Sequence, residues 1–364
     1  MEIIPATLKI IEEGRKSGVH SGAQIYISQE CKPLVDMAIG ESHDGHKMRP
    51  QTLLSWMSST KPIAAVAIAQ LWEKGLLTLD DPIYHHIPEF ESRGKDKISI
   101  RHALTHTAGI RSIDGGDYQS SWDNTIHQIC NMPIEKNWEV GEKAGYHLSS
   151  TWFILGEIIR RLDGRPIDRY VRDEIFIPLG MVDSWIGMPE EVYLGYESRI
   201  GGMYNTTSQE MELLDWHTKE HCGWVAPGSN GRGPMGDLGR FYEGILKGGR
   251  GIQNRFLSRD SISTLTSRHR TGMFDHTFQH IIDWGLGFII NSNQYGSETV
   301  PYGYGLHCSE NTYGHSGRQS STAFADPEHD LVVAVAFNGM PGERAHQKRI
   351  RQVLTSLYED LDLI

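Results

Sequence analysis

Ser55-Trp56-Met57-Ser58-Ser59-Thr60-Lys61-Pro62 leads directly into an apolar segment, Ile-Ala-Ala-Val-Ala-Ile-Ala-Gln-Leu at residues 63–71. The apolar segment predicts a buried helix, and Ser58 and Lys61 lie where it begins. Positions i and i+3 share one face of a helical turn, so the Ser58 hydroxyl and the Lys61 amine can meet. Because apolar surroundings lower the pKa of a lysine, Lys61 can take the proton from the serine. The stretch predicts an acylated nucleophile, Ser58, and its activating partner.

The same stretch also has a structural interpretation. A serine at the start of a helix is a common N-cap and needs no catalytic role. Ser-x-x-Lys is short enough to recur by chance, and it does so at residues 92–95, in a charged segment that no apolar helix follows. Considered alone, the first copy is equally compatible with a cap and with a nucleophile, so other motifs must decide.

Composition restricts the class of protein. The 364 residues are 38% hydrophobic and 22% charged, which predicts one large domain or two interleaved domains. A net charge of −11 and the lack of a basic stripe argue against nucleic acid and anionic membranes as partners. The N-terminus shows no signal-peptide pattern, and four scattered cysteines include no C-x-x-C pair. We therefore expect a cytoplasmic protein; no motif bears on its oligomeric state.

Strand patterns lie at both ends of the chain, with helical patterns between them. The expected strands are 23–28, 34–40, 284–290, 322–325 and 331–337. The expected helices are 6–17, the one starting at Ser58, 101–109, 151–162, 166–177, 236–247 and 343–358. This order predicts an α/β (α+β) fold, in which an antiparallel sheet is flanked by N- and C-terminal helices and an all-helical domain is inserted.

The same order predicts the domain boundaries. Residues 1–60 and 282–364 would form the discontinuous sheet domain, and residues 61–281 the inserted, mainly helical domain. The active site would lie in the cleft between the two.

Four ordered blocks identify a family that the chain resembles. They are Ser58-Ser59-Thr60-Lys61; Leu104-Thr105-His106-Thr107-Ala108-Gly109; Gly141 and Tyr146 ahead of Leu155-Gly156; and His315-Ser316-Gly317 before the final hairpin. Over nearly its whole length the chain resembles the serine β-lactamase and penicillin-binding-protein-like superfamily. The resemblance is to the branch of class C β-lactamases, family VIII esterases, transesterases and penicillin-binding-protein-type thioesterases, and it implies a β-lactamase/transpeptidase-like fold.

The resemblance implies roles for the later blocks. In the family the tyrosine that matches Tyr146 takes the serine proton and returns it to the leaving group, and a nearby lysinium can lower the pKa of such a phenol. His315 falls where relatives carry a Lys-Thr-Gly or His-x-Gly strand, and it could hydrogen-bond Tyr146 or a substrate carboxylate. The backbone N–H groups of Ser58 and Arg318 would form the oxyanion hole. A buried core tyrosine and an ordinary strand histidine are the structural alternatives.

Two departures from the family pattern concern the substrate. Class C β-lactamases carry Tyr-x-Asn in the third block, whereas this chain has Tyr146-His147-Leu148. His315 also replaces the lysine that pairs with a β-lactam carboxylate. Both changes argue against efficient β-lactam hydrolysis, and His147 or Ser149 would fill the polar position that the asparagine leaves.

Other residues are candidates for lining the cleft. Gly317 would let a substrate lie close to the backbone, and Ser316 would lie beside it. Trp224, and with it Trp216, could line the mouth of the cleft. His106 is a candidate catalytic base, but we expect it to have a structural role.

Two further motifs give weaker alternatives. Gly314-His315-Ser316-Gly317 resembles a nucleophile elbow, but Arg318 stands at its last glycine position. Zinc ligands are conceivable at Asp215, His217, His221 and Cys222. The expected chemistry needs neither a metal nor a cofactor, and we predict none.

The sequence thus predicts a serine hydrolase that acts through an acyl-Ser58 intermediate on a small ester or related acyl substrate. The alternative is an acyltransferase, a transesterase or a peptide-cyclising, thioesterase-like enzyme of a natural-product pathway, acting on an ester, thioester or amide. A β-lactamase or D-amino-acid peptidase is less favoured. A non-catalytic binding protein is the hypothesis from a different class.

Overall fold

The computed structural model describes residues 3–43, 45–111, 120–208, 210–251 and 256–364. Its main sheet has six antiparallel strands in the order β10-β11-β12-β13-β1-β2. Their bounds are β1 Gly22–Gln29, β2 Lys32–Gly40, β10 Ile289–Ile290, β11 Tyr313–Ser316, β12 Ser321–Asp326 and β13 Leu331–Phe337. The N-terminal hairpin therefore pairs with the C-terminal strands.

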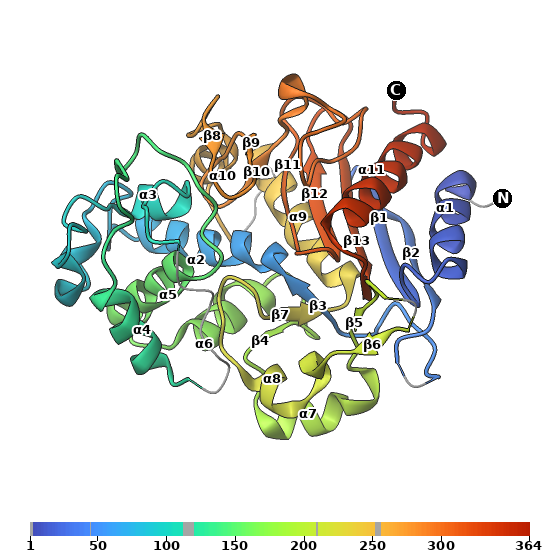
Figure 1. Cartoon of the computed structure of the whole chain (residues 1–364), viewed down its shortest axis with the longest axis horizontal. Helices are drawn as coiled ribbons and strands as arrows, with labels where there is room; N and C mark the ends of the chain where they lie inside the picture. Colours follow the sequence, from blue (N-terminus) through green and yellow to red (C-terminus); the bar gives the residue numbers. More distant parts are fainter. Residues whose placement is uncertain (1–2, 44, 112–119, 209, 252–255) are drawn as a thin grey trace.

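Helices cover both faces of this sheet. The two terminal helices, α1 (Pro5–Lys16) and α11 (Glu343–Asp360), pack together on one face, and α9 (Met235–Gly249) packs on the other (Figure 1). Successive side chains of a strand point to opposite faces, so the odd-numbered residues of β13 pack with α11 and the even-numbered ones with α9. Burial on both faces explains why β13 is an uninterrupted apolar run.

The remaining helices lie mostly beside the sheet, around α2 (Figure 1). α2 (Lys61–Glu73) is buried continuously from Lys61 to Leu71 and contacts α5, α6 and α10. A helix that is buried all round is apolar on every face, as the sequence of α2 is. The others are α3 Ile100–Leu104, α4 Trp122–Asn131, α5 Ser150–Asp163, α6 Ile167–Val171, α7 Glu190–Tyr196, α8 Lys219–Gly223 and α10 Arg259–Thr266.

Short strands form three smaller sheets. β3 (Leu54–Met57) pairs with β7 (Gly231–Gly233), which also pairs with β4 (Trp185–Ile186). β5 (Tyr204–Asn205) lies between β14 (Gly339–Met340) and β6 (Glu212–Leu213). β8 (Phe274–Asp275) pairs with β9 (His280–Ile281). The β3–β7–β4 sheet matters most for function because β3 ends immediately before Ser58.

The predicted fold class is confirmed: an antiparallel sheet carries the N- and C-terminal helices, and the other helices lie in the middle of the chain. The division into two domains stays a prediction. Helix α9 is relevant to this division: it lies within residues 61–281, the predicted inserted domain, but packs on the main sheet. None of the helices in the described ranges is both long enough and apolar enough to cross a membrane.

Two predicted elements are wrong in extent. Of residues 284–290, only Ile289 and Ile290 form a strand, because Gly285 and Gly287 make a turn in which the Gly285 amide donates to the Phe288 carbonyl. Gly287 has a φ of +80°, and a Cβ there would overlap Ala65 of α2.

The predicted helix 101–109 instead ends at Leu104. His106 has a φ of +60°, in the left-handed region that cannot continue a right-handed helix.

Candidate active site

Ser58 occupies a tight turn between β3 and α2. Residues Ser58–Thr60 form one 3₁₀ turn, preceded by Met57 with a φ of +53°. Such backbone at a non-glycine residue costs about 1–3 kcal/mol and is typical of functional turns. Thr60 Oγ1 donates to the Met57 carbonyl (2.7 Å) and accepts the Gly231 amide (2.9 Å). Ser59 Oγ donates to the His315 carbonyl (3.1 Å), so the turn is attached to both sheets.

Lys61 lies beside the serine and is completely buried. Its Nζ is 3.1 Å from Ser58 Oγ, 2.9 Å from the Leu148 carbonyl oxygen and 2.8 Å from that of Gly228. Burial holds the pKa of Lys61 well below its usual range. A neutral amine would donate its two N–H groups to the two carbonyls and turn its lone pair towards the Ser58 hydroxyl. That arrangement suits a general base.

Tyr146 completes this group from the loop before α5. The Lys61 Nζ lies 4.9 Å from the centre of the Tyr146 ring, and the tyrosine is 5% exposed. Burial raises the pKa of Tyr146 above its usual range, and an interaction with the Ser58 hydroxyl opposes this only in part. Desolvation thus acts against the lowering of the phenol pKa that we expected from a nearby lysinium. At neutral pH Tyr146 is a proton donor.

His315 reaches the same place from β11. Its Nδ1 lies 2.8 Å from the Ser316 carbonyl oxygen, and since a carbonyl only accepts, Nδ1 carries the proton. Nε2 is then a lone-pair acceptor, buried and without a hydrogen-bond partner among the described residues. Burial and the neighbouring Lys61 lower the pKa of His315 to about 3, so the ring is neutral. The position that carries a lysine in class C enzymes here presents a neutral acceptor.

Packing within the protein requires a glycine at position 317, and its predicted role beside the substrate stays a prediction. A Cβ at this position would overlap the Trp56 carbonyl oxygen and Ser321 Oγ, which belong to the protein and not to the cleft. The glycine therefore brings the end of β11 against the backbone that leads to Ser58. Its own amide donates to the Ser321 carbonyl (2.7 Å). The oxyanion role of the Ser58 and Arg318 amides stays a prediction; both residues line the cavity described next.

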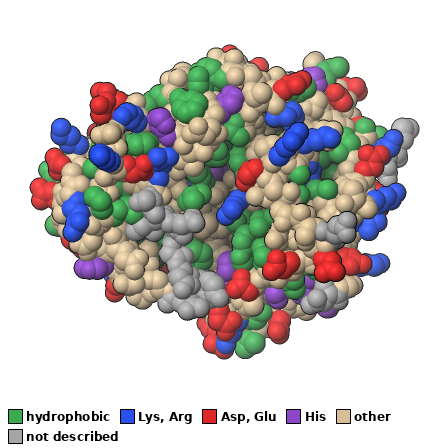
Figure 2. All heavy atoms as spheres, in the orientation of Figure 1, with side chains coloured by type: hydrophobic (Ala, Val, Ile, Leu, Met, Phe, Trp, Pro, Cys, Tyr) green, Lys and Arg blue, Asp and Glu red, His purple; other side chains and the backbone are tan. Residues whose placement is uncertain are grey.

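One cavity of about 470 Å³ unites most of the predicted site. Its wall includes Ser58, Tyr146, His315, Ser316 and Arg318. The rest of its wall is largely apolar and consists of Leu148, Thr277, Phe278, Ile289, Pro301, Tyr302, Glu343 and Gln347. The face in Figure 2 is hollowed near its centre, with hydrophobic and histidine side chains visible in the hollow.

Four predicted substrate-binding residues do not line this cavity: Gly317, described above, and His147, Ser149 and Trp224. His147 points away from it: its Nε2 accepts the Ile110 amide (3.1 Å), and its ring packs beside His106. Ser149 is buried at the start of α5. Trp224 lines a separate depression of about 270 Å³ and packs on Phe153. Leu148, not a polar neighbour, occupies the position next to Tyr146 in the cavity.

The weaker candidates from the sequence are His106, the serine of the elbow-like motif and the possible metal ligands. His106 Nδ1 accepts the His147 amide (2.9 Å), and its ring packs on Tyr146 and Trp284 with centroid separations of 4.6 and 4.4 Å. Ser316 Oγ is 3.0 Å from Thr322 Oγ1 on a neighbouring strand, and no helix follows it as in a nucleophile elbow. Within the described ranges, no three His, Cys, Asp or Glu side chains, including the four candidates around His221, form a group that could hold a metal ion.

Residues that sequence reasoning missed lie behind Tyr146. Asp275 Oδ1 accepts the Tyr146 amide (3.1 Å), and Asp275 Oδ2 accepts Arg270 Nη2 (2.9 Å). Phe278 and Tyr302 supply apolar wall to the cavity. These residues fall in segments without regular periodicity, so no pattern in a single sequence indicates them.

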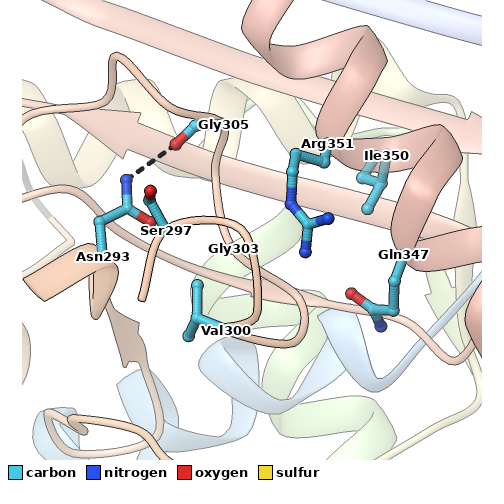
Figure 3. A pocket seen from close by; sticks show the side chains of 8 residues that line it. All are labelled: Asn293, Ser297, Val300, Gly303, Gly305, Gln347, Ile350 and Arg351. Atoms are coloured by element: carbon cyan, nitrogen blue, oxygen red, sulfur yellow. Dashed lines mark hydrogen bonds between the residues drawn. The ribbon is translucent and has the colours of Figure 1, made fainter. Parts of the chain in front are cut away.

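The small opening shown in Figure 3 is not a candidate substrate site. It lies between α11 and the loop that contains Asn293 and Gly305, whose side-chain amide and carbonyl are joined at 2.9 Å. Its volume of about 10 Å³ has room for roughly one water molecule.

Fold and cavity together define a class, the serine β-lactamase and penicillin-binding-protein superfamily. The sequence model of the family described as Beta-lactamase matches residues 8–357. The chain therefore belongs to the Beta-lactamase family.

Three relatives illustrate the range of that family. A penicillin-binding protein homologue from Caulobacter crescentus superposes with a TM-score of 0.79 at 25% identity, covering 99% of this chain and 98% of that one. A family VIII carboxylesterase gives 0.76 at 23% identity, with 99% and 98% covered. The N-acetylmuramyl-L-alanine amidase of Bacillus subtilis (strain 168) is 23% identical over 327 residues, covering 80% of this chain and 69% of the relative.

Proposed function

We propose that the protein is a carboxylic ester hydrolase that acts through an acyl-Ser58 intermediate. The observation that carries the proposal is the Lys61 amine, which is buried and lies 3.1 Å from the Oγ of Ser58, a residue that lines the cavity. Two backbone carbonyls accept the two N–H groups of a neutral amine, so the third direction is left for the serine proton.

Acylation follows from this geometry. Ser58 Oγ attacks the ester carbonyl carbon while its proton moves to Lys61 Nζ. The negative charge on the carbonyl oxygen would be held by the backbone N–H groups of Ser58 and Arg318. Tyr146 gives its phenolic proton to the departing alkoxide, and the Lys61 ammonium restores it. The products of this half-reaction are the free alcohol and acyl-Ser58.

Deacylation reverses the proton movements. Water takes the place of the alcohol, its proton passes through Tyr146 to Lys61, and Ser58 leaves with a proton from the ammonium. The raised pKa of Tyr146 and the lowered pKa of Lys61 favour this assignment, in which the resting site is a neutral pair. If an alcohol or amine replaces water, the same intermediate gives acyl transfer.

The cavity supports a substrate with an apolar group of moderate size. The rings of Tyr146, Phe278 and Tyr302 follow one another along the wall, with centroid separations of 4.8 and 5.8 Å. A volume of about 470 Å³ lies within the usual range for small-molecule sites. Leu148 offers no amide to a penicillin side chain, and neutral His315 offers no charge to a β-lactam carboxylate. Both favour an ester over a β-lactam.

Nitrophenyl esters and a fluorophosphonate test the proposal directly. We expect hydrolysis of nitrophenyl butyrate with a burst of nitrophenol, and a covalent fluorophosphonate adduct on the peptide that contains Ser58. Turnover of the ester without any adduct at Ser58, or neither signal, would refute the mechanism. Adding alcohol or amine acceptors and measuring the ratio of free acid to transfer product separates a hydrolase from an acyltransferase.

A further inference from the structure

A buried ion pair lies directly behind the candidate general acid. Arg270 and Asp275 are 2% and 0% exposed, and Arg270 Nη2 donates to Asp275 Oδ2 at 2.9 Å. The guanidinium also donates to the carbonyls of Thr105 and Ile282 and lies 5.1 Å from the centre of the Trp284 ring. The pair is therefore fixed from several sides.

The second oxygen of Asp275 holds the backbone around Tyr146. Asp275 Oδ1 accepts the amides of Tyr146 (3.1 Å), Thr277 (2.9 Å) and Phe278 (3.0 Å). Thr277 Oγ1 in turn donates to the Tyr146 carbonyl at 3.1 Å. Both polar groups of the Tyr146 peptide backbone are thus bonded to one short segment.

Stability alone does not explain such a pair. Replacing a buried ion pair by apolar side chains is often neutral or stabilising, because desolvating two charges costs as much as their attraction returns. This pair does not line the cavity; Asp275 instead accepts the backbone amides of three residues that do, Tyr146, Thr277 and Phe278. The contact with Tyr146 points to a positional role.

We propose that Asp275, oriented by Arg270, is a positioning residue that fixes Tyr146 against Ser58. The inference rests on the proposed function, because it explains how Tyr146, the proposed general acid, is held in the position that this role requires. A misplacement of about 1 Å in such a group can cost 100-fold in rate. Asp275 acts through Tyr146 and does not touch the substrate.

The charge of Asp275 should influence a measurable property, the pH dependence of kcat, which a purely structural role would leave unchanged. Its carboxylate raises the pKa of Tyr146, in the same direction as burial. The charged or titratable side chains around the phenol are Lys61, His106, His315, Tyr302, Asp275 and, through Asp275, Arg270. Burial lowers the pKa of both histidines, so they stay neutral where the phenol ionises. Removing the carboxylate charge therefore lowers the pKa of Tyr146.

Asp275→Asn keeps an oxygen for the Tyr146 amide but removes the charge. We expect kcat for nitrophenyl butyrate to fall about 10- to 100-fold with KM changed less than about 3-fold. The alkaline limb of the kcat profile should move to lower pH. Rates are expressed per active site, counted by the fluorophosphonate.

Asp283→Asn is the matched control. Asp283 is equally buried, pairs with Arg268 at 3.0 Å and accepts the Gly272 amide at 3.0 Å, but makes no bond to Tyr146. It should lose thermal stability yet keep the wild-type kcat and pH profile per active site. Equal losses of kcat in Asp275→Asn and Asp283→Asn would overturn the proposal, as would a wild-type profile in Asp275→Asn.

The double variant Arg270→Met/Asp275→Asn separates folding from position. It removes both charges, so thermal stability should recover relative to Asp275→Asn, while kcat stays low because the Tyr146 contact is still altered. Recovery of kcat together with stability would show that the pair acts only on folding and would refute the inference. A wild-type protein that neither turns over the ester nor labels at Ser58 would refute the proposed function instead, and so the two failures are distinguishable.

Discussion

Two Ser-x-x-Lys stretches in the chain share a buried lysine but differ in what the lysine contacts. Lys61 and Lys95 are both 0% exposed. Lys95 Nζ donates to the carbonyls of Ser92 (2.9 Å), Cys130 (2.9 Å) and Met132 (2.5 Å). Lys61 Nζ has two carbonyls and one hydroxyl as neighbours.

The acceptors decide the chemistry of each amine. Three carbonyls can only accept, so together they need the three N–H groups of an ammonium, and Lys95 joins these segments as a cation. Two carbonyls and a hydroxyl can be satisfied by a neutral amine. Burial lowers the pKa of both lysines, well below the usual range for Lys61. The spacing of Ser-x-x-Lys therefore does not identify a nucleophile; the neighbouring groups do.

The two serines differ as well. Ser92 Oγ donates to the Cys130 carbonyl at 3.2 Å, so its proton is directed into the protein. Ser58 lines the cavity, with its hydroxyl beside Lys61. A hydroxyl that is accessible to substrate and next to a neutral base is what nucleophilic catalysis needs.

Replacing each of the two serines should give the largest difference in activity between the stretches. Ser58→Ala should lose about 10⁴-fold or more in kcat/KM for nitrophenyl butyrate, because no acyl-enzyme can form. Ser92→Ala should retain wild-type kcat/KM. Mass spectrometry after fluorophosphonate treatment should find the adduct on Ser58 alone; an adduct on Ser92, or an active Ser58→Ala protein, would contradict the comparison.

Lysine replacement should separate catalysis from stability. Lys61→Met removes the base and should lower kcat about 10³-fold. Lys95→Met leaves three carbonyls without donors and should cost about 3 kcal/mol in the free energy of unfolding, with kcat per active site unchanged. Urea unfolding and steady-state kinetics of both variants measure the two effects. If Lys95→Met lost kcat as severely as Lys61→Met, the contrast would be wrong.

The fold could be predicted wherever one local pattern determined an element. The apolar run 331–337 predicts β13 with its observed bounds, because a strand buried on both faces needs no alternation. The run 284–290 has similar residues, but its two glycines turn the chain so that it can pack against α2. Strands of two or three residues, such as β4 and β8, are too short to show a period.

Site residues could be predicted where they belong to a family motif. They could not be predicted where contacts between distant parts of the chain bring them to the site. The structure places Ser58, Tyr146 and His315 in the wall of one cavity, with Lys61 buried beside Ser58. His147 was assigned by adjacency to Tyr146, but neighbouring residues of an extended chain point in opposite directions. Asp275 meets Tyr146 across 129 positions of sequence, a contact that no spacing within one sequence encodes.

The pH profile should sharpen the assignment of Lys61 as the base. The amine acts only when unprotonated, so kcat/KM should fall tenfold per pH unit as the pH drops below the lowered pKa of Lys61. Above that pKa the rate should reach a plateau. Lys95→Met should give the same profile, since its amine takes no part; a profile that rises towards acid would exclude a lysine base.

The smallest effect concerns the residue after each serine. Ser59 Oγ donates to the His315 carbonyl and lies 2.9 Å from Ser321 Oγ, so it attaches the nucleophile turn to β11 and β12. Its counterpart in the second stretch, Arg93, is exposed with a φ of +61°. Ser59→Ala should cost about 1 kcal/mol of stability and reduce kcat a few-fold, because the turn loses one attachment while Lys61 keeps its contacts. Arg93→Ala should leave kcat unchanged, and a larger loss there than in Ser59→Ala would show that the second stretch also supports the site.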